Sequence, residues 1–216
     1  MLRQQLGTEA FNRSLKHYLE VNRGKNVVTA DFIKAVEETT KTDVSQFFNQ
    51  WIYGAGAPKF DLSYTYDNAK HQVALTAKQT QTVGEHVGIF RVPVDVEVTT
   101  DSEAHLYSIV VSKQAETFTF PANAAPLMVL FDKGGHVLKS AEFHKEKAEW
   151  LYQLKNAADF SDRADAAVAL RKFKDAAGKN EDVINALTEA AKNDKAWGVR
   201  ATSADSLGQI GGAAAA

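Results

Sequence analysis

The chain has 216 residues, 44% of them hydrophobic, which is ordinary for a globular protein and suits one large domain or two to three small ones. Its 25 basic and 27 acidic residues give a net charge of −2, so charge offers no reason to expect nucleic acid or anionic lipid as a partner. The sequence contains no run of about 18 apolar residues, so it predicts no membrane-spanning helix. The absence of cysteine excludes disulfides, thiolate catalysis and cysteine-type zinc sites.

Residues 1–58 show the periodicity of helices. Apolar side chains recur three and four positions apart in three stretches. They are Phe11, Leu15, Tyr18 and Leu19 in the first stretch, Phe32, Ile33 and Val36 in the second, and Phe47, Phe48 and Trp51 in the third. Gly24 suits a left-handed end for the first helix, and Thr29 suits the N-cap of the second. Gly54–Pro58 would end the third helix.

Residues 59–143 alternate between apolar and polar side chains in seven or so short runs, as half-buried strands do. Asp67–Lys70 and Lys133–Gly135 predict hairpin turns, and Pro93 predicts that its strand is an edge or carries a bulge. The region therefore predicts an antiparallel β-sandwich. The residues expected in its interior, or packed against flanking helices, are Phe60, Leu62, Val73, Leu75, Val94, Val96, Leu106, Val129 and Phe131.

Residues 144–216 are rich in alanine and contain an internal repeat. Arg163, Ala164, Ala167, Leu170 and Phe173 align with Arg200, Ala201, Ala204, Leu207 and Ile210, 37 positions later. A helix with Val183, Ile184, Leu187 and Ala191 on one face lies between them. Two helices in each repeat are typical of a HEAT-like α-helical solenoid. We expect the last repeat to be truncated, one helix short of its partner.

The titratable residues suggest no catalytic or metal site. The histidines are His17, His71, His86, His105, His136 and His144, and no two have the i, i+4 spacing of a helical zinc pair. His17 is expected to pair with Glu20, three positions away on the same helix. Glu37 and Glu38 lie opposite an apolar stripe and predict a solvated helix face. We therefore predict no catalytic, cofactor-binding or metal-binding residue in this chain.

Two further features allow a functional and a structural interpretation. Gly134 and Gly135 predict a turn and not a phosphate loop, because no phosphate-binding motif surrounds them. Four aromatic residues near the end of the first region, Phe47, Phe48, Trp51 and Tyr53, could line a ligand groove. Aromatic residues at helical spacing are more often part of a core.

Two stretches of the first region resemble the M1 zinc aminopeptidases. Met1–Phe11, continuing to Leu19, is similar to the helical segment shortly after that family's catalytic tyrosine. Thr29–Phe32 and Phe47–Pro58 look like the end of its thermolysin-like catalytic domain, where a tryptophan helix leads into a β-sandwich. The resemblance implies three domains: residues 1–58 ending the catalytic domain, residues 59–143 as the β-sandwich, and residues 144–216 starting a HEAT-like domain.

The family's exopeptidase loop, His-Glu-x-x-His zinc helix and catalytic tyrosine match no position here. The resemblance therefore implies a non-catalytic C-terminal fragment, which serves as scaffold and wall of a substrate chamber. Zinc and the peptide substrate are expected only in the full-length parent, with no nucleic acid or membrane partner. The truncated helical ends could self-associate through apolar surface. The residues expected there are Phe11, Leu15, Phe32 or Phe47 at one end, and Leu207 or Ile210 at the other.

Two alternative functions stay open at this point. One is a protein-interaction module from a relative that has lost its zinc. The other is a stand-alone β-sandwich domain with helical flanks that binds a protein partner. An intact zinc helix encoded before Met1 would favour the enzyme, whereas a complete gene product of this length would favour the stand-alone domain.

Overall fold

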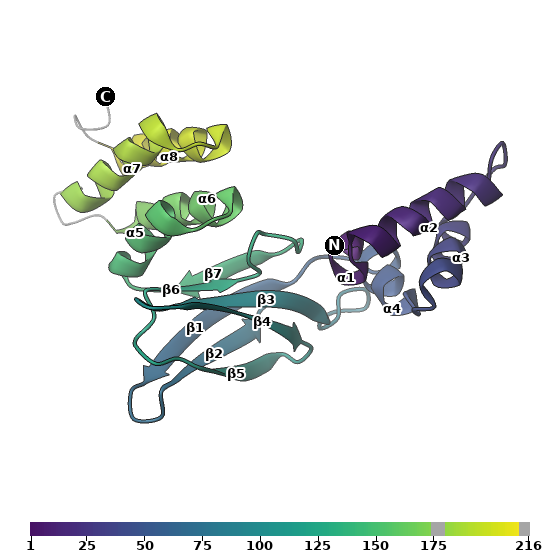
Figure 1. Ribbon diagram of the computed structural model, residues 1–216, viewed down its shortest axis with the longest axis horizontal. Coiled ribbons are helices and arrows are strands. Elements are labelled where there is room, and N and C mark those ends of the chain that lie inside the picture. Colours follow the sequence, from purple (N-terminus) through teal and green to yellow (C-terminus); the bar gives the residue numbers. More distant parts are fainter. Residues whose placement is uncertain (174–179, 212–216) are drawn as a thin grey trace.

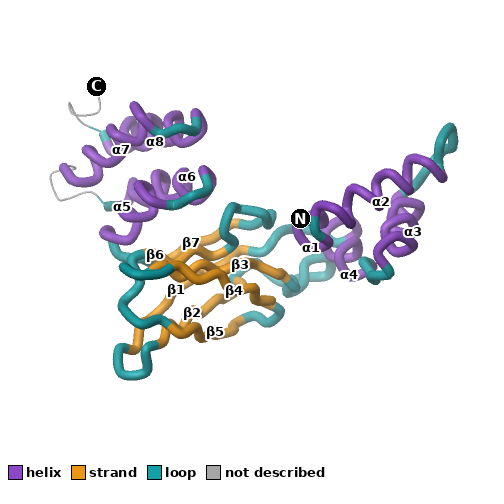
Figure 2. The backbone as a smooth tube through the Cα atoms, in the orientation of Figure 1, coloured by secondary structure: helices purple, strands orange, loops and turns teal. Residues whose placement is uncertain are grey.

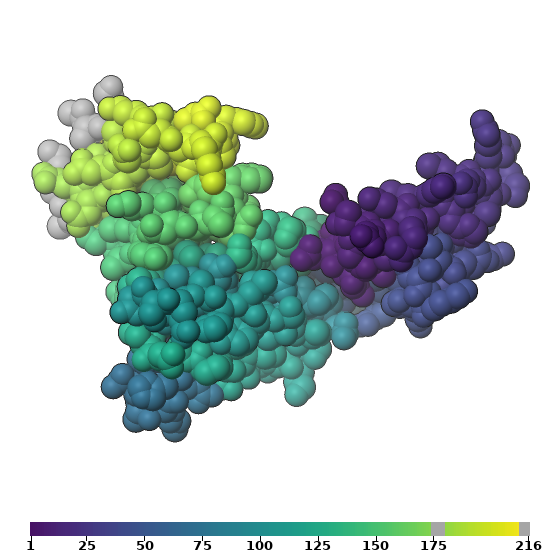
Figure 3. Space-filling model, in the orientation of Figure 1, coloured from purple at the N-terminus to yellow at the C-terminus, as the bar shows by residue number. Residues whose placement is uncertain are grey.

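The computed structural model describes residues 1–173 and 180–211. A β-sandwich lies in the middle, with one group of helices on each side of it (Figure 1). The two helical groups leave an open notch between them in the space-filling view (Figure 3). In the described residues, no helix is long and apolar enough to cross a membrane. The order of helices, β-sandwich and helical repeats confirms the predicted fold class.

The first group of helices carries its own small core. Its elements are α1 (Leu2–Leu6), α2 (Thr8–Val21), α3 (Thr29–Thr40), α4 (Ser45–Phe48) and a π-helical turn (Asn49–Tyr53). Their core is formed by Leu2, Val36, Val44 and Phe48. Gly7 separates α1 from α2 because its φ of 80° lies in the left-handed region, where a continuous helix cannot pass. Gly24 also has a positive φ, as predicted.

The start of α3 differs slightly from the prediction. Thr29 is the first helical residue, and Val28 occupies the N-cap position. The carboxylate of Asp31 accepts the backbone N–H of Val28 at 2.9 Å. This bond satisfies one of the donors that a helix start leaves free, so no Thr29 cap is needed.

Two sheets form the sandwich. The strands are β1 (Lys59–Asp67), β2 (Gln72–Gln79), β3 (Val92–Thr99), β4 (Ala104–Val111), β5 (Ala115–Pro121), β6 (Met128–Phe131) and β7 (Ser140–His144). One sheet has the order β5-β2-β1-β7 and the other β4-β3-β6. The chain turns at 68–71 between β1 and β2, as predicted, and all pairs are antiparallel except β1 with β7, which is parallel. The orange strands in Figure 2 show the two layers.

Three details of the sandwich contradict the sequence analysis. Lys133–Gly135 forms a turn, but it joins β6 in one sheet to β7 in the other and is no hairpin. Pro93 lies in the central strand β3; it is tolerated because β6 pairs only with Val96–Thr99 and needs no donor from position 93. Leu106 is 57% exposed because it pairs with Glu97 on the outer face. The other predicted interior residues are buried.

The second group of helices packs as two antiparallel pairs. Its elements are α5 (Lys147–Asn156), α6 (Phe160–Ala169), a 3₁₀ turn (Leu170–Lys172), α7 (Glu181–Asn193) and α8 (Trp197–Ile210). α5 packs on α6 and α7 on α8, and α8 also packs on α6. α8 thus has packing partners in α6 and α7, and truncation of the last repeat stays a prediction. Ile210 is buried and Leu207 half-buried, which contradicts the expected apolar surface at this end.

Candidate functional site

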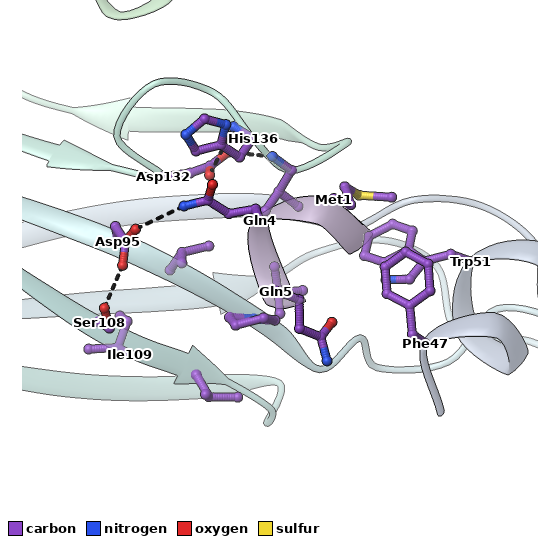
Figure 4. A pocket seen from close by; sticks show the side chains of 15 residues that line it. Met1, Gln4, Gln5, Phe47, Trp51, Asp95, Ser108, Ile109, Asp132 and His136 are labelled. Carbon is purple, nitrogen blue, oxygen red and sulfur yellow. Dashed lines mark hydrogen bonds between the residues drawn. The ribbon is translucent and has the colours of Figure 1, made fainter. Parts of the chain in front are cut away.

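A cleft lies where α1 and the π-helical turn meet the sandwich (Figure 4). Its volume is about 320 Å³. The lining residues come from α1, the aromatic end of the first region, β3, β4 and the β6–β7 loop. Those labelled in Figure 4 are Met1, Gln4, Gln5, Phe47, Trp51, Asp95, Ser108, Ile109, Asp132 and His136. The cleft thus has an apolar end at the aromatic rings and a polar end at the carboxylates.

The carboxylates of the cleft are already engaged. Asp95 accepts hydrogen bonds from Ser108 Oγ at 2.6 Å and from Gln4 Nε2 at 3.4 Å. Asp132 is buried and accepts the backbone N–H groups of His136 and Val137 at 3.2 and 2.9 Å, together with the Lys139 ammonium. These bonds hold loops and helices in place. The carboxylates of the cleft therefore have a structural role in this part of the chain.

The four predicted aromatic residues divide between the two interpretations. Phe47 and Trp51 line the cleft, and the Trp51 ring lies 5.2 Å from the ring of Phe90. Phe48 is buried in the core of the helices, whereas Tyr53 is 60% exposed. The side-chain amide of Gln50, beside Trp51, donates a hydrogen bond to the backbone carbonyl of Arg91 and accepts one from the backbone N–H of the same residue. This end of the first region therefore attaches the helices to the sandwich.

The histidines lie apart from one another. His17 pairs with Glu38 at 2.9 Å, not with Glu20, and this hydrogen bond lowers the pKa of Glu38. His105 pairs with Glu103 and His144 with Asp61, both at 3.0 Å. His71 is in the β1–β2 turn, His86 in the β2–β3 loop, and His136 at the cleft.

The predicted solvated pair of carboxylates has two different roles. Glu38 is exposed, whereas the half-buried Glu37 accepts the backbone N–H of Val44 at 3.3 Å. Within residues 1–173 and 180–211, no three His, Cys, Asp or Glu side chains come together as a metal site would require.

A buried polar network joins the sandwich to the second group of helices. Lys145 is 8% exposed, and its Nζ lies 4.3 Å from the ring centres of both Phe143 and Trp150. The same atom donates to Gln153 Oε1 at 2.7 Å. Burial lowers the pKa of Lys145 to about 7, because removal from water disfavours the charged amine.

Asp162 on α6 extends this network to the β6–β7 turn. Both of its carboxylate oxygens lie 3.2 Å from the backbone nitrogen of Gly134, and its carbonyl accepts Gln153 Nε2 at 2.7 Å. Burial raises the pKa of Asp162 to about 6. Neither Lys145 nor Asp162 stood out in the sequence, because nothing in the local pattern marks a charged residue as buried.

The comparisons with known proteins agree with this architecture. Residues 1–51 match the peptidase family M1 domain, and residues 148–216 match HEAT repeats. Aminopeptidase N of Haemophilus influenzae is 32% identical over 80 residues, which make up 37% of this chain and 9% of that protein. The chain is related to the M1 aminopeptidases. Its order of domains fits the C-terminal portion of an M1 aminopeptidase.

Other M1 relatives give the same result. Aminopeptidase N of Lactococcus lactis is 36% identical over 86 residues, covering 40% of this chain and 10% of that protein. The matches thus span about a tenth of each relative. The crystal structure of Legionella pneumophila aminopeptidase A in complex with aspartic acid superposes with a TM-score of 0.75 at 14% identity. It covers 97% of this chain and 25% of the Legionella protein, so it shows a shared fold.

Proposed function

We propose that the chain is the non-catalytic C-terminal part of a zinc-dependent aminopeptidase, which removes N-terminal amino acids from peptides. Residues 1–58 complete the catalytic domain, residues 59–143 form the sandwich domain, and residues 144–216 start the HEAT-like domain. The observation that carries the proposal is the M1 match over residues 1–51, which lies directly before a sandwich whose other side carries the HEAT match. Zinc belongs to the parent's catalytic domain, where it would polarise the scissile carbonyl.

The role of the chain in this proposal is that of a scaffold. Gln50 and Trp51 fix the catalytic-domain helices to the sandwich, and the buried network of Lys145 and Asp162 fixes the repeats on the other side. The sandwich therefore sets the distance and angle between the two helical groups. The notch between them would be one side of the substrate chamber (Figure 3).

The test of the parent's activity uses a longer expressed protein. The chain is produced together with any coding sequence that precedes Met1, and separately as the 216 residues alone. We expect near-stoichiometric zinc by elemental analysis, and hydrolysis of amino-acid p-nitroanilides, in the longer protein only. A longer protein that folds without zinc or activity would instead favour an interaction module from a zinc-less relative. A gene product that is complete at Met1 would overturn the proposal.

Two exposed aromatic residues support the role of chamber wall. Phe160 and Trp197 are the first residues of α6 and α8, are 37 positions apart, and are 61% and 77% exposed. The loops that lead into these helices lie on the side facing the notch (Figure 2). In the longer protein, Trp197→Ala should raise KM several-fold for a decapeptide and leave KM for a p-nitroanilide unchanged. Leu106→Ala, at a residue 57% exposed on the outer face of the sandwich, is the control. Equal effects on both substrates would contradict a chamber wall.

We also propose that the isolated chain self-associates through its first helical group. The residues named from the sequence are half-buried there: Phe11, Leu15, Phe32 and Phe47. Four exposed apolar side chains gather at the far end of α2 and just before α3, and they are Leu19, Val21, Val27 and Val28. Sedimentation velocity over a range of concentrations should show dimers that Leu19→Gln and Val28→Gln weaken. A monomer at every concentration would refute this contact.

A further inference from the structure

The free edge of β7 borders a groove between the sandwich and the repeats. The groove measures about 560 Å³, and its walls come from β6, β7, α5 and α6. β7 is the last strand of its sheet and pairs on one side only, with β1. Ser140, Ala141 and Glu142 are exposed along this strand. Figure 1 shows β7 on the side of the sandwich that is nearest to α5 and α6.

Two residues of β7 direct their backbone N–H and C=O groups into the groove. The N–H of Ser140 donates to the carbonyl of Pro58 at 3.1 Å, so Ser140 faces β1. Neighbouring residues of a strand direct their N–H and C=O groups to opposite sides, and Ala141 and Phe143 therefore face away from β1. Among the described residues, neither N–H has a hydrogen-bond partner on that side. The edge is thus a row of free donors and acceptors.

The groove also contains side-chain polar atoms that need partners. Trp150 is only 5% exposed and lines the groove, yet its Nε1 has no hydrogen-bond partner in the described part of the chain. Ser161 on α6 also lines the groove, and its Oγ has no hydrogen-bond partner among the described residues either. A buried donor without a partner is costly, so these two atoms favour a ligand that supplies hydrogen-bond acceptors. Peptide carbonyl groups have this property.

The charges of the groove favour a basic ligand. Its lysines are Lys139, Lys145 and Lys172, and its acids are Glu142, Asp162 and Asp165. Lys139 is neutralised by the buried Asp132, and burial leaves Lys145 only partly charged at neutral pH. Burial also raises the pKa of Asp165, although its side chain is open to the solvent of the groove. This leaves Lys172 against three acids, and within the described residues none of these acids forms an ion pair, although the charges of Lys139 and Lys145 act on Asp165.

We propose that β7 binds an extended basic peptide, which adds to the sheet as a strand and lies in this groove. The peptide backbone would bond to Ala141 and Phe143, and a basic side chain would face Asp165. Strand addition of this kind takes its affinity from backbone hydrogen bonds and its specificity from side-chain contacts. The site does not depend on the proposed aminopeptidase role, because it uses only residues of the sandwich and the repeats.

The test measures binding of a fluorescein-labelled pentapeptide, in which a central lysine is flanked by valine and threonine, by fluorescence anisotropy. Ala141→Pro removes one N–H that faces the groove and no bond to β1, so it should weaken binding about tenfold or more. Asp165→Asn should weaken binding about threefold to tenfold. Ala104→Pro, at the exposed start of the edge strand β4, is the control for proline, and Glu85→Gln on an exposed loop is the control for charge. Neither control should change affinity.

Hydrogen exchange gives a second readout that does not depend on variants. The bound peptide should slow exchange at Ala141 and Phe143 and leave Ser140 and Glu142 unchanged, because those two already face β1. Absence of binding, equal binding by a folded Ala141→Pro variant, or equal binding of a peptide with central glutamate would each overturn the proposal. So would protection of Ala141 that rises with protein concentration without peptide, since a second copy would then occupy the edge.

Discussion

The two helical groups are attached to the same sandwich in different ways. Helices α1–α4 bury Leu2, Val36, Val44 and Phe48 in a core of their own, and they reach the sandwich mainly through Trp51 and Gln50. Within the part of the chain that the structure describes, helices α5–α8 have no separate core of that kind. Their buried side chains belong to the same cluster as the strand interiors, and they include Trp150, Leu154, Leu170, Leu187 and Val199.

This difference indicates how the molecule should unfold. Each large apolar side chain stabilises the folded state by about 1.5–3 kcal/mol when it is buried. A core shared by strands and repeats couples their unfolding into one transition. The first helical group contributes few side chains to that core, so it can open while the strands stay folded.

The largest expected effect comes from the ion pair between the two helix pairs. Arg163 donates to both carboxylate oxygens of Asp194, at 2.6 and 3.0 Å, and their side chains are 5% and 8% exposed. Asp194→Ala leaves Arg163 buried without its counter-charge and should lower the free energy of unfolding by about 3–5 kcal/mol. The matched pair in the first group, His17 with Glu38, is largely exposed, so Glu38→Ala should have no measurable effect. Urea titrations would compare the unfolding free energies of the two variants, and equal losses would contradict the view that burial makes the Arg163–Asp194 pair the more important one.

A core substitution in each group tests whether the cores are separate. Leu187 and Val36 are both fully buried. Leu187→Ala should cost about 2–5 kcal/mol and speed hydrogen exchange in the strands as well as in the repeats. Val36→Ala should speed exchange in α1–α4 alone. Strand exchange that is unaffected by Leu187→Ala would show that the repeats unfold independently of the sandwich.

The smallest of the three effects is a pH dependence at the junction of the sandwich with the repeats. The pKa of Asp162 is raised from 3.8 to about 6, so the folded state binds the extra proton and stability falls as pH rises between these values. The pKa of Lys145 is lowered from 10.5 to about 7, so the folded state binds fewer protons and stability rises with pH between these values. These two groups therefore contribute a minimum of stability between pH 6 and pH 7.

Urea midpoints at pH 5, 6.5 and 9 would reveal this minimum. Lys145→Met should reduce the rise on the alkaline side, and Asp162→Asn should reduce the fall on the acid side, to which the raised pKa of Asp165 also contributes. The exposed Glu85→Gln should leave the profile of the unmodified chain unchanged. A profile that keeps both slopes in the two junction variants would assign the pH dependence to other groups.

Most of the fold follows from patterns that are local in sequence. Alternation located the strands and most of the interior, because each strand has one buried face. Leu106 was misplaced because a shift of one residue exchanges the faces, and only its partner Glu97 fixes the register. The parallel pairing of β7 with β1 could not be predicted, since it depends on which sheet the chain enters after Gly135.

The candidate sites were less accessible to prediction. The cleft combines α1 with β3 and β4, which are distant in sequence, and Lys145 is buried only because α5 folds over it. One clue was present in the repeat, which aligns Arg163 with Arg200. Both arginines bond to Asp194: Arg163 donates to its carboxylate, and Arg200 Nη1 donates to its backbone carbonyl at 2.8 Å.

The bond between Arg163 and Asp194 has a mechanical consequence. Arg163 lies on α6 of the first helix pair and Asp194 at the end of α7 in the second, so their ion pair opposes sliding or tilting of the pairs against each other, whereas the bond from Arg200 holds Asp194 within its own pair. The two helix pairs then move as one rigid body, and the molecule bends at the segments that connect its parts. The compliant connection is the Gly54–Pro58 segment, where Gly56 has a positive φ and few bonds reach the sandwich. A load on the repeats would therefore move the first helical group before it changed the curvature of the solenoid.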